Sequence, residues 1–395
     1  MLRSTLLGLL LPAALHAQPE LRNAVTINND FAFRLFQKAE TADKNLCISP
    51  YSITSAFAMC YAGAAGKTET EFQTVFGFGA NDDKTHGSFG ALQKAVDARN
   101  RPGVQLGVAN RLFQEQTFSV PQGFLKQVEK HYGAGVQLLD FKSQFEPSRL
   151  LINNWVEDKT KKRIKDLLPN GSINDKTVLV LVNTLYMKAD WQTAFEKKET
   201  QPASFTLANG SKTTVAMMHT HNTFRYASDA HFQSVELPFK GDSLSMIFVL
   251  PVAQGPLETS RMHLSKNWYD KLQPAQTEVD LYLPKFKTEC ALALKKPLTA
   301  MGMRDAFTGF VADFSRLDPT KRTYISEAFH KTFVEVEESG AEAAAATAIV
   351  INEADSVSVA RYVALRFDRP FFYIIRDRIT NTILFIGEME EPVKI

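Results

Sequence analysis

The residues of this chain that could perform chemistry are few and scattered. His219 and His221 are two positions apart, so both imidazoles would lie on one face of a strand, but the sequence supplies no third metal ligand for them. The stretch from Gly63 to Thr68 looks like a phosphate-binding loop, yet Tyr61 stands where the first glycine is required, after a helical pattern. We therefore expect a surface histidine pair, with no metal and no other cofactor.

Covalent catalysis also lacks its usual signatures. No G-x-S-x-G, H-E-x-x-H or C-x-x-C motif occurs in the sequence. The cysteines Cys47, Cys60 and Cys290 are too few for a disulfide framework and allow one bridge at most. We expect that the protein is not an enzyme and has no catalytic residue.

The composition and net charge of the chain bear on which kinds of partner it could bind. The chain has 45 Lys and Arg residues against 43 Asp and Glu, a formal charge of +2, so nothing favours nucleic acid or an anionic membrane. Hydrophobic residues make up 45% of the chain, with 29 Phe and only 22% charged residues, which is typical of a folded protein with a large core. A length of 395 residues suggests two or three domains as a first expectation.

The N-terminus has the layout of an export signal. Arg3 precedes an apolar run from Leu6 to Leu15, and the small residue Ala17 follows. The run is too short to anchor the protein across a bilayer, and the alternative is a buried amphipathic first helix. We expect a signal peptide over residues 1–17, whose removal leaves 378 of 395 residues in a secreted, periplasmic or extracellular protein without a membrane anchor.

Helical patterns dominate the front of the chain. Apolar residues recur at helical spacing over residues 30–38 and 52–61. A further helical pattern begins at Glu146-Pro147, and the cations from Lys159 to Lys165 indicate its solvated far end.

Strand patterns dominate the back. Residues 177–187 form an almost unbroken β-branched and apolar run, typical of a strand covered on both faces, and Asn183 within it requires hydrogen-bond partners if it is buried. Further strand-like runs cover residues 234–238, 244–250, 278–283, 331–336, 370–375 and 382–386. Since strands and helices do not alternate and no linker is visible, the pattern favours an α+β fold.

One segment, residues 334–358, has a different sequence pattern from the segments on either side of it. It begins as an alternating strand, passes Gly340, and is alanine-rich from Ala341 to Ala348. Alanine is the strongest helix former, so a short helix between two strands is one interpretation. If the segment is instead a strand, alternate side chains point to the same face, and that face carries only small and β-branched residues. These are Ala341, Ala343, Ala345, Thr347, Ile349 and Ile351. The segment could then be an exposed loop that later becomes a strand.

On these residues the chain resembles the serpin superfamily. Residues 337–348 are similar to the proximal hinge of inhibitory serpins, with a glutamate two positions before the glycine and small residues after it. Other segments of the chain also resemble segments of the family and occur in the same order as in its members. They are residues 45–53, 181–195, 281–286, 328–331, 367–371 and 384–387. The resemblance covers roughly residues 25–391. It implies one domain over residues 18–395, with helices around a large mixed β-sheet, smaller sheets, and an exposed reactive-centre loop at about 338–362.

The resemblance also implies a mechanism. Family members offer the loop to a serine or cysteine endopeptidase, which forms an acyl-enzyme with it, and the cut loop then inserts into the central sheet before water releases the protease. We expect a suicide-substrate inhibitor of this kind. The alternative is a non-inhibitory binding or storage protein whose loop is cut without insertion. We expect the protein to be a monomer. Polymerisation is also possible, because the loop of one molecule could add to the sheet of another.

Residue roles in the hinge are carried over position by position. Gly340 matches the hinge glycine, and Ala341 is the first residue to enter the sheet, where Thr or Ser is more common in the family. The remaining hinge positions are Glu338, Glu342, Ala343, Ala344, Ala345, Ala346 and Thr347.

Two further groups match the family. A polar cluster beneath the sheet, which exchanges hydrogen bonds between the uninserted and inserted states, would contain Ser49, Ser52, Asn183 and His330. The point where the loop first enters would contain Trp191, Lys285 and Glu338, with a contact between Lys285 and Glu338.

The reactive bond follows from family spacing. In most inhibitory members the hinge glutamate is seventeenth before the scissile bond, which places the bond between Ala354 and Asp355. A small residue at Ala354 favours elastase-like or subtilisin-like proteases. Cleavage one residue later, after Asp355, or after Glu353, would suit proteases that cut after acidic residues.

Overall fold

The structure is a computed structural model that describes residues 19–40, 45–133, 135–341 and 362–392. Its front third is mainly helical, as the apolar spacing predicts. The elements there are α2 (Pro19–Phe36), β1 (Leu46–Ile48), α3 (Pro50–Gly63), α4 (Gly66–Phe76), α5 (Asp83–Asp97), α6 (Gln122–Tyr132) and α7 (Phe141–Lys159). The later helices are short: η1 (Lys197–Glu199), α8 (Leu257–Arg261), α9 (Lys266–Lys271), α10 (Lys295–Ala300) and η2 (Asp305–Phe307). No helix among the described residues is long and apolar enough to cross a membrane.

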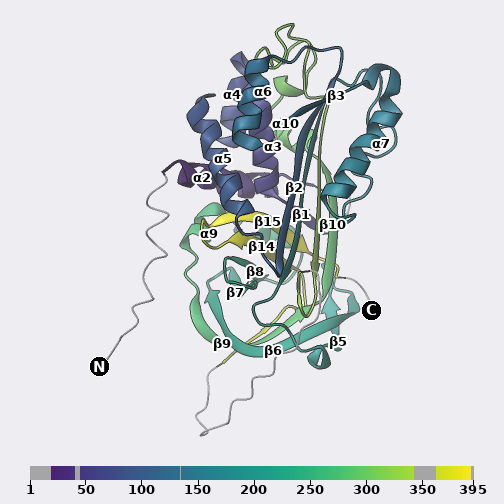
Figure 1. Ribbon diagram of the computed structural model, residues 1–395. Helices are drawn as coiled ribbons and strands as arrows, with labels where there is room; N and C mark the ends of the chain where they lie inside the picture. Colours follow the sequence, from purple (N-terminus) through teal and green to yellow (C-terminus); the bar gives the residue numbers. More distant parts are fainter. Residues whose placement is uncertain (1–18, 41–44, 134, 342–361, 393–395) are drawn as a thin grey trace, which may run out of the picture.

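A six-stranded sheet, called here the central sheet, runs through the upper part of the molecule (Figure 1). Its strand order is β10, β11, β4, β2, β3, with β12 beside β4. The bounds are β2 (Val104–Glu115), β3 (Val136–Leu139), β4 (Leu179–Asp190), β10 (Phe286–Ala293), β11 (Glu327–Val336) and β12 (Gly340–Ala341). β4 runs parallel to β11 and antiparallel to β2, so the sheet is mixed.

Strand β4 is covered on both faces, as its unbroken apolar run predicts. Val180 and Val182 belong to a core cluster shared with α7, whereas Leu181 and Leu185 belong to the main core. Figure 1 shows the same arrangement, with α7 on one side of the central sheet and α3, α5 and α6 on the other.

A second sheet has nine strands in the order β1, β15, β14, β8, β7, β6, β9, β13, with β5 beside β6. Its bounds are β5 (Gln201–Thr206), β6 (Lys212–Ser228), β7 (Phe232–Pro238), β8 (Leu244–Pro251), β9 (Ala275–Pro284), β13 (Val363–Arg366), β14 (Phe371–Asp377) and β15 (Thr382–Met389). Together the two sheets and the surrounding helices confirm the predicted α+β class, with a large mixed sheet and helices around it.

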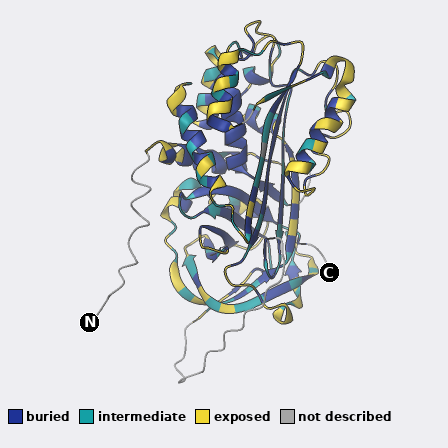
Figure 2. Ribbon diagram, in the orientation of Figure 1, coloured by how far each residue is buried: buried dark blue, intermediate teal, exposed yellow. Residues whose placement is uncertain are grey.

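Helix α3 lies at the centre of the core. Ser49 caps its N-terminus by accepting a hydrogen bond from the backbone of Ser52, and Pro50 occupies its first turn, where proline is tolerated. All 14 residues of α3 are buried, and Figure 2 shows this helix in dark blue beside the central sheet. The first turn of α3 therefore has a fixed position against the strands.

The prediction for α7 holds at its start and is wrong at its end. Asp140 accepts a hydrogen bond from the backbone of Ser143 and starts a short turn at Phe141, but this turn breaks at Gln144, so the main helix begins beside the predicted Glu146-Pro147. The helix also ends at Lys159, so the following cations do not extend it. The backbone turns there into the left-handed region, at Lys161 and Lys162, with φ of 51° and 62°.

Candidate functional site

Three polar side chains form a row across the central sheet. Asn110 on β2 pairs in register with Asn183 on β4, which pairs with His330 on β11. Asn183 and His330 are 0% and 1% exposed, so their polar atoms require partners inside the protein. Those partners come from the row itself and from Ser49 and Ser52 at the start of α3. We call these five residues the sheet cluster.

Hydrogen bonds connect the sheet cluster across three strands and one helix. The backbone N–H of Ser49 donates to His330 Nε2 at 2.9 Å, and His330 Nδ1 lies 2.5 Å from Asn183 Oδ1. Asn183 Nδ2 donates to Asn110 Oδ1 at 2.8 Å and to the carbonyl of Ser52. The Ser52 hydroxyl adds a bond of 3.2 Å to Asn110 Oδ1. The cluster thus ties β4 to β2 and β11.

The imidazole of His330 is neutral in this environment. Because Ser49 donates to Nε2, that nitrogen carries no proton, and the proton sits on Nδ1, facing the Asn183 carbonyl oxygen. Burial lowers the pKa of His330 from 6.5 to about 3, and the contact with Asn183 opposes this only in part. The cluster therefore holds its geometry without any formal charge.

The structure brings together Ser49, Ser52, Asn183 and His330, as the sequence analysis groups them, and it adds Asn110. This residue was missed because β2 was not predicted. Val104, Leu106 and Val108 alternate as on a strand, but Asn110 interrupts this apolar series, and nothing local indicated a register that would place Asn110 opposite Asn183.

A second group surrounds Glu338, and we call Trp191, Lys285 and Glu338 the hinge anchor. Lys285 Nζ lies 2.9 Å from Glu338 Oε2, so the predicted contact is present. The Thr200 hydroxyl donates to the other carboxylate oxygen of Glu338 at 3.0 Å, a partner that the sequence did not indicate. Burial opposes ionisation of Glu338, but the bonds from Lys285 and Thr200 outweigh it, and its pKa lies below the usual 4.5.

Trp191 fixes the backbone of the same turn. Its N–H donates to the carbonyl of Ser339 at 2.8 Å, and its indole Nε1 donates to the carbonyl of Glu337 at 3.0 Å. The indole itself is held by stacking on Phe239, with ring centroids 4.5 Å apart and planes 6° apart. The chain that follows β11 is therefore held at this point by backbone and side-chain contacts together.

The hinge begins immediately after this turn. Gly340 and Ala341 form β12, paired antiparallel with Asp190 and Ala189 of β4. Gly340 has φ of 152°, and a Cβ there would lie 2.2 Å from the carbonyl oxygen of Ala189, so only glycine fits. Ala341 is 3% exposed and extended, which favours the strand interpretation at this residue.

Other predicted positions lie outside the described residues. These are the signal peptide at 1–17, the hinge positions Glu342, Ala343, Ala344, Ala345, Ala346 and Thr347, and the reactive bond between Ala354 and Asp355. The choice between a helix and an insertable strand remains a prediction beyond Ala341.

The histidine pair lies on one face of β6. His219 Nε2 is 2.7 Å from Asp280 Oδ1, and His221 Nε2 is 2.8 Å from Glu278 Oε1, so each ring pairs with a carboxylate of β9. Among the described parts of the chain, no three His, Cys, Asp or Glu side chains gather as a metal site. All three cysteines are buried, and none of them is part of a disulfide.

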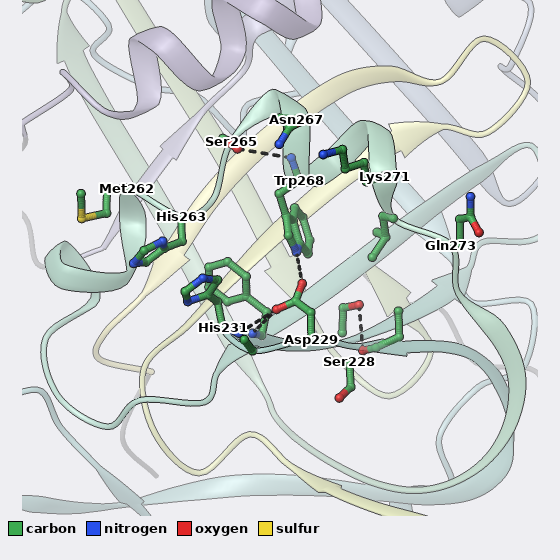
Figure 3. Close-up of a pocket in the computed structure, with 15 residues that line it drawn as sticks. Ser228, Asp229, His231, Met262, His263, Ser265, Asn267, Trp268, Lys271 and Gln273 are labelled. Atoms are coloured by element: carbon green, nitrogen blue, oxygen red, sulfur yellow. Dashed lines mark hydrogen bonds between the residues drawn. The ribbon is translucent and has the colours of Figure 1, made fainter.

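A cavity of about 680 Å³ lies elsewhere, between the β6–β7 turn and the short helices α8 and α9 (Figure 3). The rings of His231 and His263 stack in its wall with centroids 3.9 Å apart, and Asp229 accepts a hydrogen bond from Trp268 Nε1. None of the residues lining it belongs to the sheet cluster or the hinge anchor, so we assign it no part in the chemistry of the hinge.

Comparison with known proteins gives a consistent result. A family model described as Serpin (serine protease inhibitor) matches residues 26–392. The chain is 36% identical to antithrombin-III of Mus musculus, over 92% of this chain and 81% of that protein. It is also 36% identical to the leukocyte elastase inhibitor of Xenopus laevis, over 92% and 97%. Human thyroxine-binding globulin in complex with thyroxine has a similar structure, with a TM-score of 0.83, 29% identity, and coverage of 95% and 100%.

Proposed function

This chain belongs to the serpin family, and we propose that it is a suicide-substrate inhibitor of a serine endopeptidase. On this proposal it does not catalyse a reaction of its own. The protease attacks the loop, and the inhibitor responds by a change of shape that traps the acyl-enzyme.

The observation that supports this proposal most directly is the pairing of Gly340 and Ala341 with β4. These two residues form the start of a strand in the same sheet that the cut loop would have to join. Ala341 has a side chain small enough to be buried beside Ala189, and the residues after it are also small. Insertion would extend a strand that has already begun.

The register of β12 indicates where insertion would lead. Gly340 pairs with Asp190 and Ala341 with Ala189, so continuing the antiparallel register would bring Thr347 opposite Asn183. To get there the loop must separate β4 from β11, which are paired from Glu327 to Phe333. The hydrogen bond between His330 and Asn183 spans this junction and would have to break. Asn183 would then find a new partner in the inserted strand.

Insertion of the loop up to the reactive bond would move the protease far. From Ala341 to Ala354 is roughly 14 residues, or about 46 Å at ~3.3 Å per residue. We expect the protease, attached to Ala354 through its acyl bond, to be carried to the opposite end of the central sheet. Distortion of its active site there would prevent hydrolysis.

The target protease follows from the reactive bond. Ala354 before the bond favours an elastase-like or subtilisin-like protease, because a shallow specificity pocket accepts alanine. Cleavage after Asp355 would instead assign a protease that cuts after acidic residues. We also infer export through a cleaved signal peptide at residues 1–17, which would bring the inhibitor to extracellular or periplasmic proteases.

A second function has one observation in its favour. Thyroxine-binding globulin, which has a similar structure, was solved in complex with thyroxine. The chain could therefore be a binding protein whose loop is cut without insertion.

The test is a panel of an elastase, a subtilisin and a protease that cuts after acidic residues. Inhibition predicts an SDS-resistant complex with at least one of them, a loop fragment ending at Ala354 or Asp355 by mass spectrometry, and a large rise in melting temperature after loop cleavage. A loop that is cut without a complex and without this rise would support the binding function, and a cut after Arg361 would contradict both predicted bonds.

A further inference from the structure

An exposed apolar turn lies between η2 and β11. Phe310 is 96% exposed and Val311 is 52% exposed, and no other large apolar side chain among the described residues is as exposed as Phe310. The turn is closed by the backbone N–H groups of Val311 and Ala312, which donate to the carbonyl of Thr308 at 3.2 and 3.0 Å. We call Phe310 and Val311 the apolar tip.

The backbone of the apolar tip has an unusual conformation for an aromatic residue. Phe310 has φ of 62°, in the left-handed region, where a bulky side chain is disfavoured and glycine or asparagine is the ordinary choice. Single exposed apolar residues are common on protein surfaces and need no explanation. A phenylalanine that is both almost fully exposed and held in a disfavoured conformation is different, because such conformations are concentrated at functional sites. The apolar tip is therefore a candidate contact surface.

The turn lies at one end of the central sheet. Gly309 lies against the ring of Tyr324, because a Cβ at Gly309 would be 3.4 Å from Tyr324 Cε1. Tyr324 comes three residues before β11 begins, and the backbone of Ser326, next to β11, donates to the carbonyl of Leu179 at 3.1 Å. Leu179 is the first residue of β4. The apolar tip is therefore beside the end of the sheet at which β4 and β11 both begin.

The same end of the sheet is where the inserted loop would finish. Continuing the register of β12 along β4 would bring Ala354 opposite Lys176, three residues before β4 begins. Continuing the parallel register of β4 and β11 places Tyr324 level with Thr177. Ala354, which would carry the acyl bond, would therefore arrive within about one residue of the level of Tyr324, the residue against which the turn lies.

A protease attached at this point would face the sheet with its active site. The acyl bond joins its nucleophile to Ala354, so the specificity cleft beside that nucleophile is the nearest part of its surface. A cleft that accepts alanine is lined by apolar groups, which are the chemical match for an exposed phenylalanine and valine. Insertion would therefore bring an apolar part of the protease next to the apolar tip.

We propose that Phe310 and Val311 are a contact surface for the trapped protease and help to hold it after insertion. This inference rests on the proposed function, because the contact requires the loop to insert. Burying a fully exposed phenylalanine is worth roughly tenfold or more in an equilibrium constant. The loop leaves the sheet beside Asp190, at the other end of β4, so the contact cannot form at the first attack. It slows the release of the protease and leaves the rate of its capture unchanged.

The first test compares complexes formed with an elastase and with a subtilisin. The variant carries Phe310→Asn and Val311→Ser, and it should fold normally because both side chains are exposed and asparagine tolerates the left-handed region. We expect an unchanged rate of complex formation and an unchanged rise in melting temperature on loop cleavage, with active protease released from the complex roughly fivefold faster or more. Met262→Ser is the control, because Met262 is 69% exposed at the end of α8 and should leave the release rate unchanged.

A second readout reports the contact itself. Phe310→Cys can be labelled selectively with an environment-sensitive dye, because the three native cysteines are buried. The dye emission should shift to the blue when protease is trapped, and should not shift when the loop is cut without insertion in an added Ala341→Arg variant.

The outcomes separate the contact from the proposed function. Complexes that form but release protease at the unaltered rate, or that give no dye shift, would overturn the contact and leave the inhibitor function standing. A dye shift before any protease is added, with a dimer on gel filtration, would assign the apolar tip to a second copy of the chain and also overturn it. A loop that is cut by every protease without a complex would overturn both.

Discussion

The hinge anchor and the sheet cluster hold the same sheet closed by different physical means. The anchor uses an ion pair between Lys285 and Glu338, whose side chains are 32% and 8% exposed. The cluster uses neutral hydrogen bonds around a histidine that is fully buried. Charge is tolerable where water reaches the pair and would be costly under the sheet. The anchor is therefore suited to holding a turn at the surface, and the cluster to holding β4 against β2 and β11.

The largest effect should come from the residue between these two regions. We expect Ala341→Arg to abolish the trapping of protease, because a long cation cannot be buried beside Ala189 and insertion would stop at its first step. The protein should then be cleaved as a substrate, with no SDS-resistant complex. Ala341→Thr, which is small and common in the family, is the control and should still form the complex. A complex with Ala341→Arg would contradict the role assigned to this residue.

The sheet cluster should respond most strongly in stability. Asn183→Ala removes the shared partner of His330, Asn110 and Ser52, so we expect a loss of about 2–4 kcal/mol in the free energy of unfolding. Denaturant unfolding measures this, and gel filtration should show more polymer on gentle heating. Asn170→Ala, the same substitution at an exposed turn before β4, is the control and should change stability by less than about 0.5 kcal/mol. Equal losses of stability in the two variants would contradict the view that the sheet cluster stabilises the fold more than an exposed side chain does.

The pH dependence should separate the two regions. His330 has a pKa of about 3 in the folded state and 6.5 as its ordinary value, so below pH 6.5 the unfolded chain binds a proton that the folded chain does not. Stability should therefore fall as the pH decreases, by about 2 kcal/mol between pH 6.5 and 5 from this residue alone. The lowered pKa of Glu338 acts later, with stability lost only as the pH falls below about 4.5.

Two histidine variants can show which residue causes the fall in stability with decreasing pH. His330→Gln should flatten the fall in stability above pH 5 and also impair complex formation. Burial lowers the pKa of His86 to about 4 in a separate site between α5 and α6, so His86→Gln should flatten the slope while complex formation persists. An unchanged slope in His330→Gln would show that this imidazole is not held neutral.

The smallest effect should come from the ion pair of the anchor. Glu338→Ala leaves the partly exposed Lys285 without its partner, and we expect a loss of about 1 kcal/mol in stability with a modest rise in the inhibitor consumed per protease trapped. Glu337→Ala is a matched control, because Glu337 lies 3.9 Å from the same amine and is more exposed. No change in either stability or inhibition in Glu338→Ala would show that the pair does not hold the turn.

The fold class and the most apolar strands could be predicted from the sequence, which is about half of the strands in the described residues. β4, β8 and β14 are apolar on both faces, and this property is local and visible in any window of seven residues. β2 and β5 were missed because they are partly exposed and polar residues interrupt their apolar series, and β6 was anticipated only at His219 and His221. Their partners are determined by pairing with strands far away in the sequence, which no local pattern contains.

The same limit applies to the site. Family resemblance located the residues that lie in recognisable segments, including Asn183, His330 and Glu338. It did not find Asn110 or Thr200, because each acquires its role only through a neighbour more than 70 residues away in the chain. A polar residue on an ordinary strand carries no local signal of the side chain it will face.

The complete burial of α3 determines which substitutions the protein can accumulate during evolution. Each of its 14 residues lies against other protein atoms, so a change at almost any of them alters the packing or leaves a polar group without a partner. In β10 buried and exposed residues alternate, and every second position is free to vary. In a library of single substitutions, surviving variants should be almost missing from Pro50 to Gly63. Lineages that carry this gene would therefore accumulate their differences elsewhere and keep this one helix nearly unaltered.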